Sequence, residues 1–80
     1  MDTAEVQSKV KSVISNVLKM NEAEIGNDAN FIFDLGADSM QSLELVAAFQ
    51  EEFDIEMDQE KALEIQTVAD AVKFIANYLN

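Results

Sequence analysis

One hydroxyl at the start of an apolar helical pattern is the first candidate for chemistry in this sequence. It belongs to Ser39, in the stretch LGADSMQSLELV that covers residues 35–46. Serine becomes a nucleophile when an adjacent base takes its proton and a third group orients that base. The sequence has no histidine and no cysteine, and the pattern of its lysines and acids does not indicate a substitute base. We therefore predict that the chain itself is not an enzyme.

The sequence around Ser39 predicts a hydroxyl that other molecules can reach. A serine here could serve simply as a helix cap, which would be a structural role. Asp38 caps a helix at least as well, however, and Gln41 is placed to complete a capping box with it. Ser39 would then be the first helical residue, with its hydroxyl free. Because the unpaired N–H groups and the positive dipole end of a helix favour an anion, Ser39 is well placed to accept a phosphate ester.

Four segments carry apolar residues at helical spacing, and they predict the elements that position Ser39. The expected helices cover about residues 3–19, 39–53 and 59–64, and a last helix follows a capping Thr67. No strand-like alternation persists along the sequence. We predict an all-α four-helix bundle with a short third helix, formed by residues 1–80 as a single domain with one core.

A long loop is expected between the first two helices, over residues 21–37. It lacks sustained periodicity, but it contains large apolar residues, some of which should pin it to the core: Ile25, Phe31, Ile32, Phe33 and Leu35. Gly36, near its end, allows the chain to turn tightly into the second helix. A loop of this length is unusual in so small a domain and often has a function.

Acidic residues dominate the charge of the chain. Sixteen acids against five lysines give a net charge of −11, and residues 34–64 alone carry ten acids and one lysine, net −9. Phosphate backbones and anionic membrane surfaces should repel such a chain, so we expect no nucleic-acid partner. We expect a monomer whose partners are proteins with basic patches.

The composition also bears on location and on metal chemistry. No apolar run approaches the length of a membrane span, and the first residues, MDTAEVQSKV, lack the apolar core of a signal peptide. These features predict a cytoplasmic protein without membrane insertion. Without cysteine, the chain has no disulfide and no thiolate metal site.

The second helix has more apolar surface than its core face requires. At 100° per residue, the core face would hold Leu45, Val46, Phe49 and Phe53. A second strip, on the outer side, combines apolar and acidic residues: Met40, Leu43, Glu44, Ala47 and Glu51. Apolar contact supplies binding energy and acids steer a basic partner, so this strip is predicted to be a docking surface.

The sequence resembles the acyl carrier proteins over nearly its whole length. The resemblance rests on FIFDLGADSMQSLELV, on the following EEFDIEM, and on TVADAVKFI near the end. In that family the D-S-[LM] signature after L-G-A carries 4′-phosphopantetheine on its serine, which is Ser39 here. The resemblance implies that a phosphopantetheinyl transferase moves this arm from coenzyme A onto Ser39. The thiol of the arm would then hold acyl groups as thioesters, which agrees with a chain that has no cysteine of its own.

The resemblance also implies roles for other residues. The recognition face for partner enzymes, which include acyl transferases and ketosynthases with basic docking patches, would comprise Asp38, Met40, Leu43, Glu44, Ala47 and Glu51. The interior between the helices often shelters the acyl chain in this family. Candidates to line such an acyl pocket are Phe31, Ile32, Phe49, Met57, Ala62, Ile65, Ala71 and Phe74, each of which could equally be an ordinary core residue.

Several positions depart from the pattern of carriers that serve general fatty-acid synthesis. Met40 and Gln41 follow the serine where leucine and an acid are usual, and Phe33 stands where an acid is usual. Ala47 replaces a larger apolar residue, and Asp58 replaces a proline before the third helix. These departures favour a dedicated carrier for a polyketide or another specialised acyl pathway, but they leave the general fatty-acid role open.

Two other functions are compatible with a small acidic helical chain. A calcium-binding loop requires oxygen ligands at positions 1, 3 and 5, glycine at 6 and glutamate at 12. Loops that start at Asp28 or Asp34 both fail this pattern, so no metal site is predicted. The remaining alternative is an adaptor that binds basic partner proteins through its acidic helix without any modification.

Overall fold

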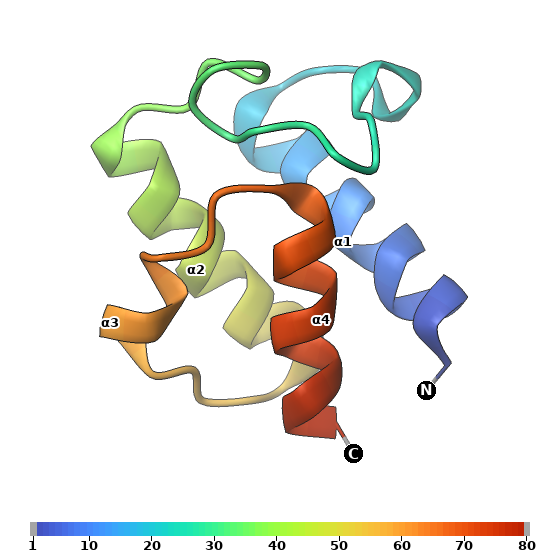
Figure 1. Cartoon of the computed structure of the whole chain (residues 1–80), viewed down its shortest axis with the longest axis vertical. Coiled ribbons are helices and arrows are strands. Elements are labelled where there is room, and N and C mark those ends of the chain that lie inside the picture. Colours follow the sequence, from blue (N-terminus) through green and yellow to red (C-terminus); the bar gives the residue numbers. More distant parts are fainter. Residues whose placement is uncertain (1, 80) are drawn as a thin grey trace.

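The fold is built from α-helices and connecting turns. The computed structural model describes residues 2–79, and within them the helices are α1 (Thr3–Leu18), α2 (Ser39–Phe53), α3 (Gln59–Ala62) and α4 (Val68–Leu79) (Figure 1). A short 3-10 helix, η1 (Glu22–Glu24), follows α1. No β-strand forms within residues 2–79, so the predicted all-α class with a short third helix is confirmed.

Polar side chains just before the helices determine where two of them begin. The Glu5 N–H donates a hydrogen bond of 2.9 Å to the Asp2 carboxylate at the start of α1. The Asp70 N–H donates one of 3.2 Å to Thr67 Oγ1 at the start of α4. Each acceptor satisfies a backbone donor that the first turn of a helix leaves unpaired. The starts of α1 and α4 therefore lie where these capping residues predict them.

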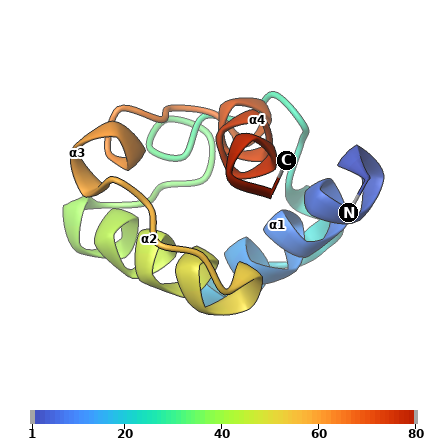
Figure 2. The same ribbon diagram turned by 90° about the horizontal axis from the view of Figure 1, so that it is seen from below.

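The helices pack around α1, which contacts both α2 and α4. Viewed along the bundle, α1 and α2 lie side by side, α4 lies across from them, and α3 stands at the edge beside α2 (Figure 2). Every buried side chain is apolar among the described residues. The predicted core face of α2 is buried, which comprises Leu45, Val46, Phe49 and Phe53. On α1 the buried residues are Val6, Val10, Val13 and Ile14, whereas Val17 on the same face is half-buried.

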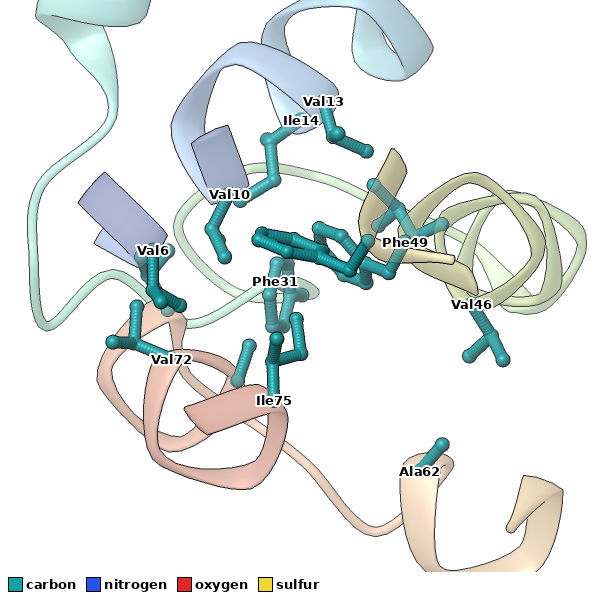
Figure 3. Packing of buried hydrophobic residues seen from close by; sticks show 14 of the residues in the cluster. Val6, Val10, Val13, Ile14, Phe31, Val46, Phe49, Ala62, Val72 and Ile75 are labelled. Carbon is teal, nitrogen blue, oxygen red and sulfur yellow. The ribbon is translucent and has the colours of Figure 1, made fainter. Parts of the chain in front are cut away.

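The long loop crosses one end of the bundle and contributes to its core (Figure 1). Figure 3 shows Phe31 of this loop among Val10 of α1, Phe49 of α2 and Ile75 of α4. Ile25 is buried as well. The prediction that apolar side chains pin the loop to the core is confirmed for these two residues, whereas Ile32 and Phe33 are exposed.

Local structure differs from the sequence prediction at two places. The third helix ends at Ala62 rather than at Glu64. The Leu63 N–H still donates to the Gln59 carbonyl, but the N–H groups of Glu64 and Ile65 donate to carbonyls only three residues back. Such bonds tighten a helix end into a 3-10 turn. The helix η1 was not predicted, although Asn21 caps it by accepting a bond from the Ala23 N–H.

The concentrated negative charge predicts a fold that salt stabilises. All ten acids between residues 34 and 64 are exposed, so salt can screen their mutual repulsion. At about 10 mM salt the Debye length is about 30 Å. The molecule measures 30 × 25 × 18 Å, so every acid then acts on every other. Repulsion is stronger in the compact state than in the unfolded chain.

Raising NaCl from about 10 mM to about 300 mM should therefore raise the melting temperature. A gain of about 1 kcal/mol in the free energy of unfolding corresponds to about 4–8 °C for a domain of this size. Thermal unfolding followed by circular dichroism measures the shift. A Glu52→Gln variant should melt higher at low salt and gain less from added salt. A melting temperature independent of salt would contradict this electrostatic account.

Candidate functional site

Ser39 is the first residue of α2, and a complete capping box lies directly around it. The Gln41 N–H donates to Asp38 Oδ1 at 2.8 Å, and the Asp38 N–H donates to Gln41 Oε1 at 3.2 Å. The predicted capping roles of these two residues are therefore confirmed. The first helical backbone bond runs from the Ser42 N–H to the Asp38 carbonyl, 2.9 Å. The N–H groups of Ser39 and Met40 precede it and remain directed out of the helix end.

Two hydroxyls one turn apart differ in their availability. The Ser42 side chain is half-buried, and its Oγ donates to the Asp38 carbonyl at 3.0 Å. Ser39 is exposed, and its hydroxyl takes part in none of the side-chain hydrogen bonds formed among residues 2–79. A reagent that approaches this end of α2 therefore meets the Ser39 hydroxyl first, free of any intramolecular partner.

A hydrogen-bonded turn holds the chain that leads into Ser39. The Asn30 carboxamide oxygen accepts from the N–H groups of Ile32 and Phe33, both at 2.9 Å, and the Asp34 carboxylate accepts from the Asn30 N–H at 2.7 Å. Gly36 ends the turn with φ +73°, a left-handed conformation that costs other residues steric strain. The predicted tight turn at this glycine is thus present.

The same turn is fastened to the segment that precedes α4. The Phe31 N–H donates to the Gln66 carbonyl at 2.9 Å, and the Val68 N–H donates to the Ala29 carbonyl at 3.0 Å. These bonds join parts of the chain that are more than 30 residues apart. The entrance to α2 is therefore fixed by the fold as a whole, which gives Ser39 a defined position.

The strip of α2 that was predicted to dock partners is accessible. All six of its residues are exposed: Asp38, Met40, Leu43, Glu44, Ala47 and Glu51. On an ideal helix the last five fall within about 100° of one another, on the side away from the buried Phe49. This surface combines apolar side chains with carboxylates and borders Ser39.

A pocket of about 230 Å³ opens beside α2, between that helix, the long loop and the segment 63–66 that follows α3. Four of the predicted acyl-pocket residues line it: Phe31, Ile32, Phe49 and Ile65. The lining is largely apolar, with Asn30, Ser42 and Gln66 as its polar members. Its floor is buried core, whereas Ile32 at its edge is exposed.

The other four predicted pocket residues lie elsewhere. Met57, Ala62 and Ala71 are buried in the core and do not line this pocket. Phe74 packs edge-on against Tyr78, with ring centroids 5.3 Å apart, and borders a separate surface hollow between α3 and α4. A role for these four residues in holding an acyl chain stays a prediction.

Ser39 projects on the side of α2 that faces this pocket. At 100° per residue, Ser39, Leu43 and Val46 lie within about 60° of one another. Val46 lines the pocket, and so does Ser42, one turn beyond Ser39. A group attached to the Ser39 hydroxyl would therefore begin its path beside the pocket opening.

Sequence reasoning missed several residues of the pocket. These are Asn30, Phe33, Ser42, Leu45, Val46, Leu63 and Gln66. Part of the pocket lining could have been predicted from helical spacing, which places four of its residues on one face of α2: Ser42, Leu45, Val46 and Phe49. The contributions from the loop and from the residues after α3 depend on the two backbone bonds that join these segments, which no local pattern predicts.

Two kinds of feature are absent from residues 2–79, a cluster of metal ligands and a membrane-spanning helix. Within residues 2–79 no group of three or more acidic side chains is arranged to hold a metal ion. No helix in this range has the length and apolarity needed to cross a membrane.

Comparison with known protein families identifies the kind of site that this arrangement forms. A family model described as a phosphopantetheine attachment site matches residues 8–75, which is most of the chain. Domains of this kind are the attachment sites of the covalent 4′-phosphopantetheine group. They are generally non-catalytic carriers that work with a phosphopantetheinyl transferase and with synthase enzymes.

Proposed function

Because the chain belongs to the family of phosphopantetheine attachment domains, we propose that it is an acyl carrier protein whose arm is bound to Ser39. The observation that supports Ser39 most directly is its free, exposed hydroxyl at the first position of α2. Ser42, the nearest alternative, is half-buried and already donates to the Asp38 carbonyl. In this proposal the chain carries acyl groups but catalyses no step.

The attachment reaction needs little from this chain beyond presentation of its hydroxyl. The Ser39 oxygen forms a bond to the phosphorus of coenzyme A that bears the pantetheine. The bond between that phosphorus and the nucleotide part breaks, and the nucleotide part leaves. The hydroxyl proton passes to a base on the transferase, since the chain has no histidine of its own to accept it. The outward N–H groups at the start of α2 favour the phosphodiester that results. The arm supplies a thiol that holds an acyl group as a thioester.

The pocket is suited to an acyl chain carried on this arm. Its volume of about 230 Å³ exceeds the roughly 150 Å³ of an engineered apolar cavity that holds benzene. A short acyl chain could therefore be sheltered against Phe31, Ile32, Phe49 and Ile65. The cargo would belong either to fatty-acid synthesis or to a specialised polyketide or acyl pathway. We further propose a cytoplasmic, monomeric carrier whose partners dock on the exposed strip of α2.

The proposal predicts that the purified chain accepts one phosphopantetheine and no more. The apo protein, incubated with coenzyme A and a promiscuous phosphopantetheinyl transferase, should gain the mass of a single arm in an intact-mass measurement. The unmodified-adaptor alternative predicts no gain. The mass of protein isolated from its own host should include the arm and would also identify the acyl group that it carries.

A further inference from the structure

Three large apolar side chains are exposed around the opening of the pocket. Phe33 is 88% exposed, Ile32 is 59% exposed and Leu63 is 49% exposed. We refer to these three residues as the apolar rim. All of them line the same pocket as Ser42, which lies one helical turn from Ser39. An apolar cluster of this kind beside a functional residue marks a site of contact with another molecule.

The two loop residues of the rim, Ile32 and Phe33, have hydrogen-bonded backbones even though their side chains face solvent. The N–H groups of Ile32 and Phe33 both donate to the Asn30 side chain, and the adjacent Phe31 N–H donates to the Gln66 carbonyl before α4. The Phe33 ring gains little burial from folding, whereas its backbone N–H is held by a hydrogen bond. A preorganised aromatic side chain loses little conformational freedom on binding, and aromatic residues are enriched at the centres of protein interfaces.

We propose that the apolar rim is a docking anchor for the phosphopantetheinyl transferase that loads Ser39. The contact surface of that enzyme would present an apolar socket for Phe33 with lysine or arginine side chains around it. This inference rests on the proposed attachment at Ser39, and it adds a specific contact residue that lies outside the exposed strip of α2.

The size of a typical protein interface favours the transferase as the partner that contacts the rim. The transferase must bring its catalytic groups to the Ser39 hydroxyl itself, whereas later enzymes receive the end of a long arm. A stable interface covers about 800 Å² on each partner, which corresponds to a disc with a radius of about 16 Å. Centred on Ser39, such a disc would take in the rim, since Phe33 and Ser42 border a single pocket of about 230 Å³.

The charge around the rim favours a basic partner over a second copy of this chain. Asp34 follows Phe33 directly, Glu64 follows Leu63, and Asp38 precedes Ser39, and all three acids are exposed. Each copy has a net charge of −11, so a dimer through the rim would bring two strongly acidic surfaces together. A socket bordered by basic side chains would instead complement these carboxylates.

The test is the rate at which the transferase of the organism that makes this chain loads Phe33→Ala. We expect kcat/KM for the apo protein to fall at least tenfold, mainly through a higher KM, because the ring contributes to docking rather than to the chemical step. Phe33→Leu, which keeps an apolar side chain, should recover most of the rate. Both variants should melt at the wild-type temperature, since the ring is almost fully exposed.

The salt dependence of kcat/KM distinguishes apolar contact at the rim from electrostatic steering by the acids. The loss caused by Phe33→Ala should persist at high salt, whereas the loss caused by Glu44→Lys should change with salt. Equal kcat/KM for wild type and Phe33→Ala would overturn the inference, as would a wild-type dimer that Phe33→Ala dissociates in sedimentation. A wild-type chain that accepts no arm at all would instead contradict the proposed function.

Discussion

Ser39→Ala should abolish loading by phosphopantetheine completely. The variant lacks the hydroxyl that is exposed at the first position of α2 and that takes part in no side-chain hydrogen bond among residues 2–79. The capping box should survive, because it consists of Asp38 and Gln41 rather than Ser39. Alanine is also favourable within a helix, so the fold should be at least as stable as before. Intact-mass analysis after incubation with coenzyme A and transferase should show a single unmodified species.

Ser42→Ala is the matched control for this experiment. It removes a hydroxyl one turn further along the same helix, at the cost of the hydrogen bond to the Asp38 carbonyl. Loss of one such bond lowers the free energy of unfolding by about 0.5–1.5 kcal/mol, which should leave the protein folded. Ser42→Ala should therefore still accept one arm. An arm on Ser39→Ala, or its absence from Ser42→Ala, would place the attachment at a different residue.

The helices and the caps could be predicted from sequence because local interactions determine them. Apolar spacing along 3–19 and 39–53 defines one buried face for each helix, and the structure buries those faces. Asp38 and Gln41 are three residues apart and satisfy each other's backbone N–H groups. The availability of Ser39 follows from this arrangement, since Asp38 takes the capping role that the serine could otherwise fill.

The pocket could be predicted only in part because it depends on segments far apart in the sequence. Phe31 and Ile65 both line it, as predicted, but they come together through the bond from the Phe31 N–H to the Gln66 carbonyl. Met57 and Ala71 have the same apolar character, yet they face the interior elsewhere. Residue type alone predicts burial, whereas the position of a pocket also depends on the tertiary contacts that leave space between elements.

Ile75→Ala should have the largest effect on stability of the substitutions considered. Ile75 is 0% exposed and, with Val10 and Phe31, belongs to the core cluster that joins α1, α4 and the long loop (Figure 3). Truncating such a side chain leaves a cavity and lowers the free energy of unfolding by about 2–5 kcal/mol. A domain of this length has about 4–12 kcal/mol in total. Urea unfolding followed by circular dichroism should show the midpoint lowered by about 1 M or more.

Ile32→Ala removes the same atoms from a side chain that is 59% exposed, so its free energy of unfolding should change by about 0.5 kcal/mol or less. Comparing the free energies of unfolding of the two variants would thus distinguish the contribution of the core that supports the site from that of the rim that borders it. Amide hydrogen exchange extends the comparison, because Phe31, whose N–H donates to the Gln66 carbonyl, belongs to the same core cluster as Ile75. The protection of the Phe31 N–H should fall in Ile75→Ala and persist in Ile32→Ala. Equal protection in both variants would mean that the core around Ile75 does not hold the loop that leads to Ser39.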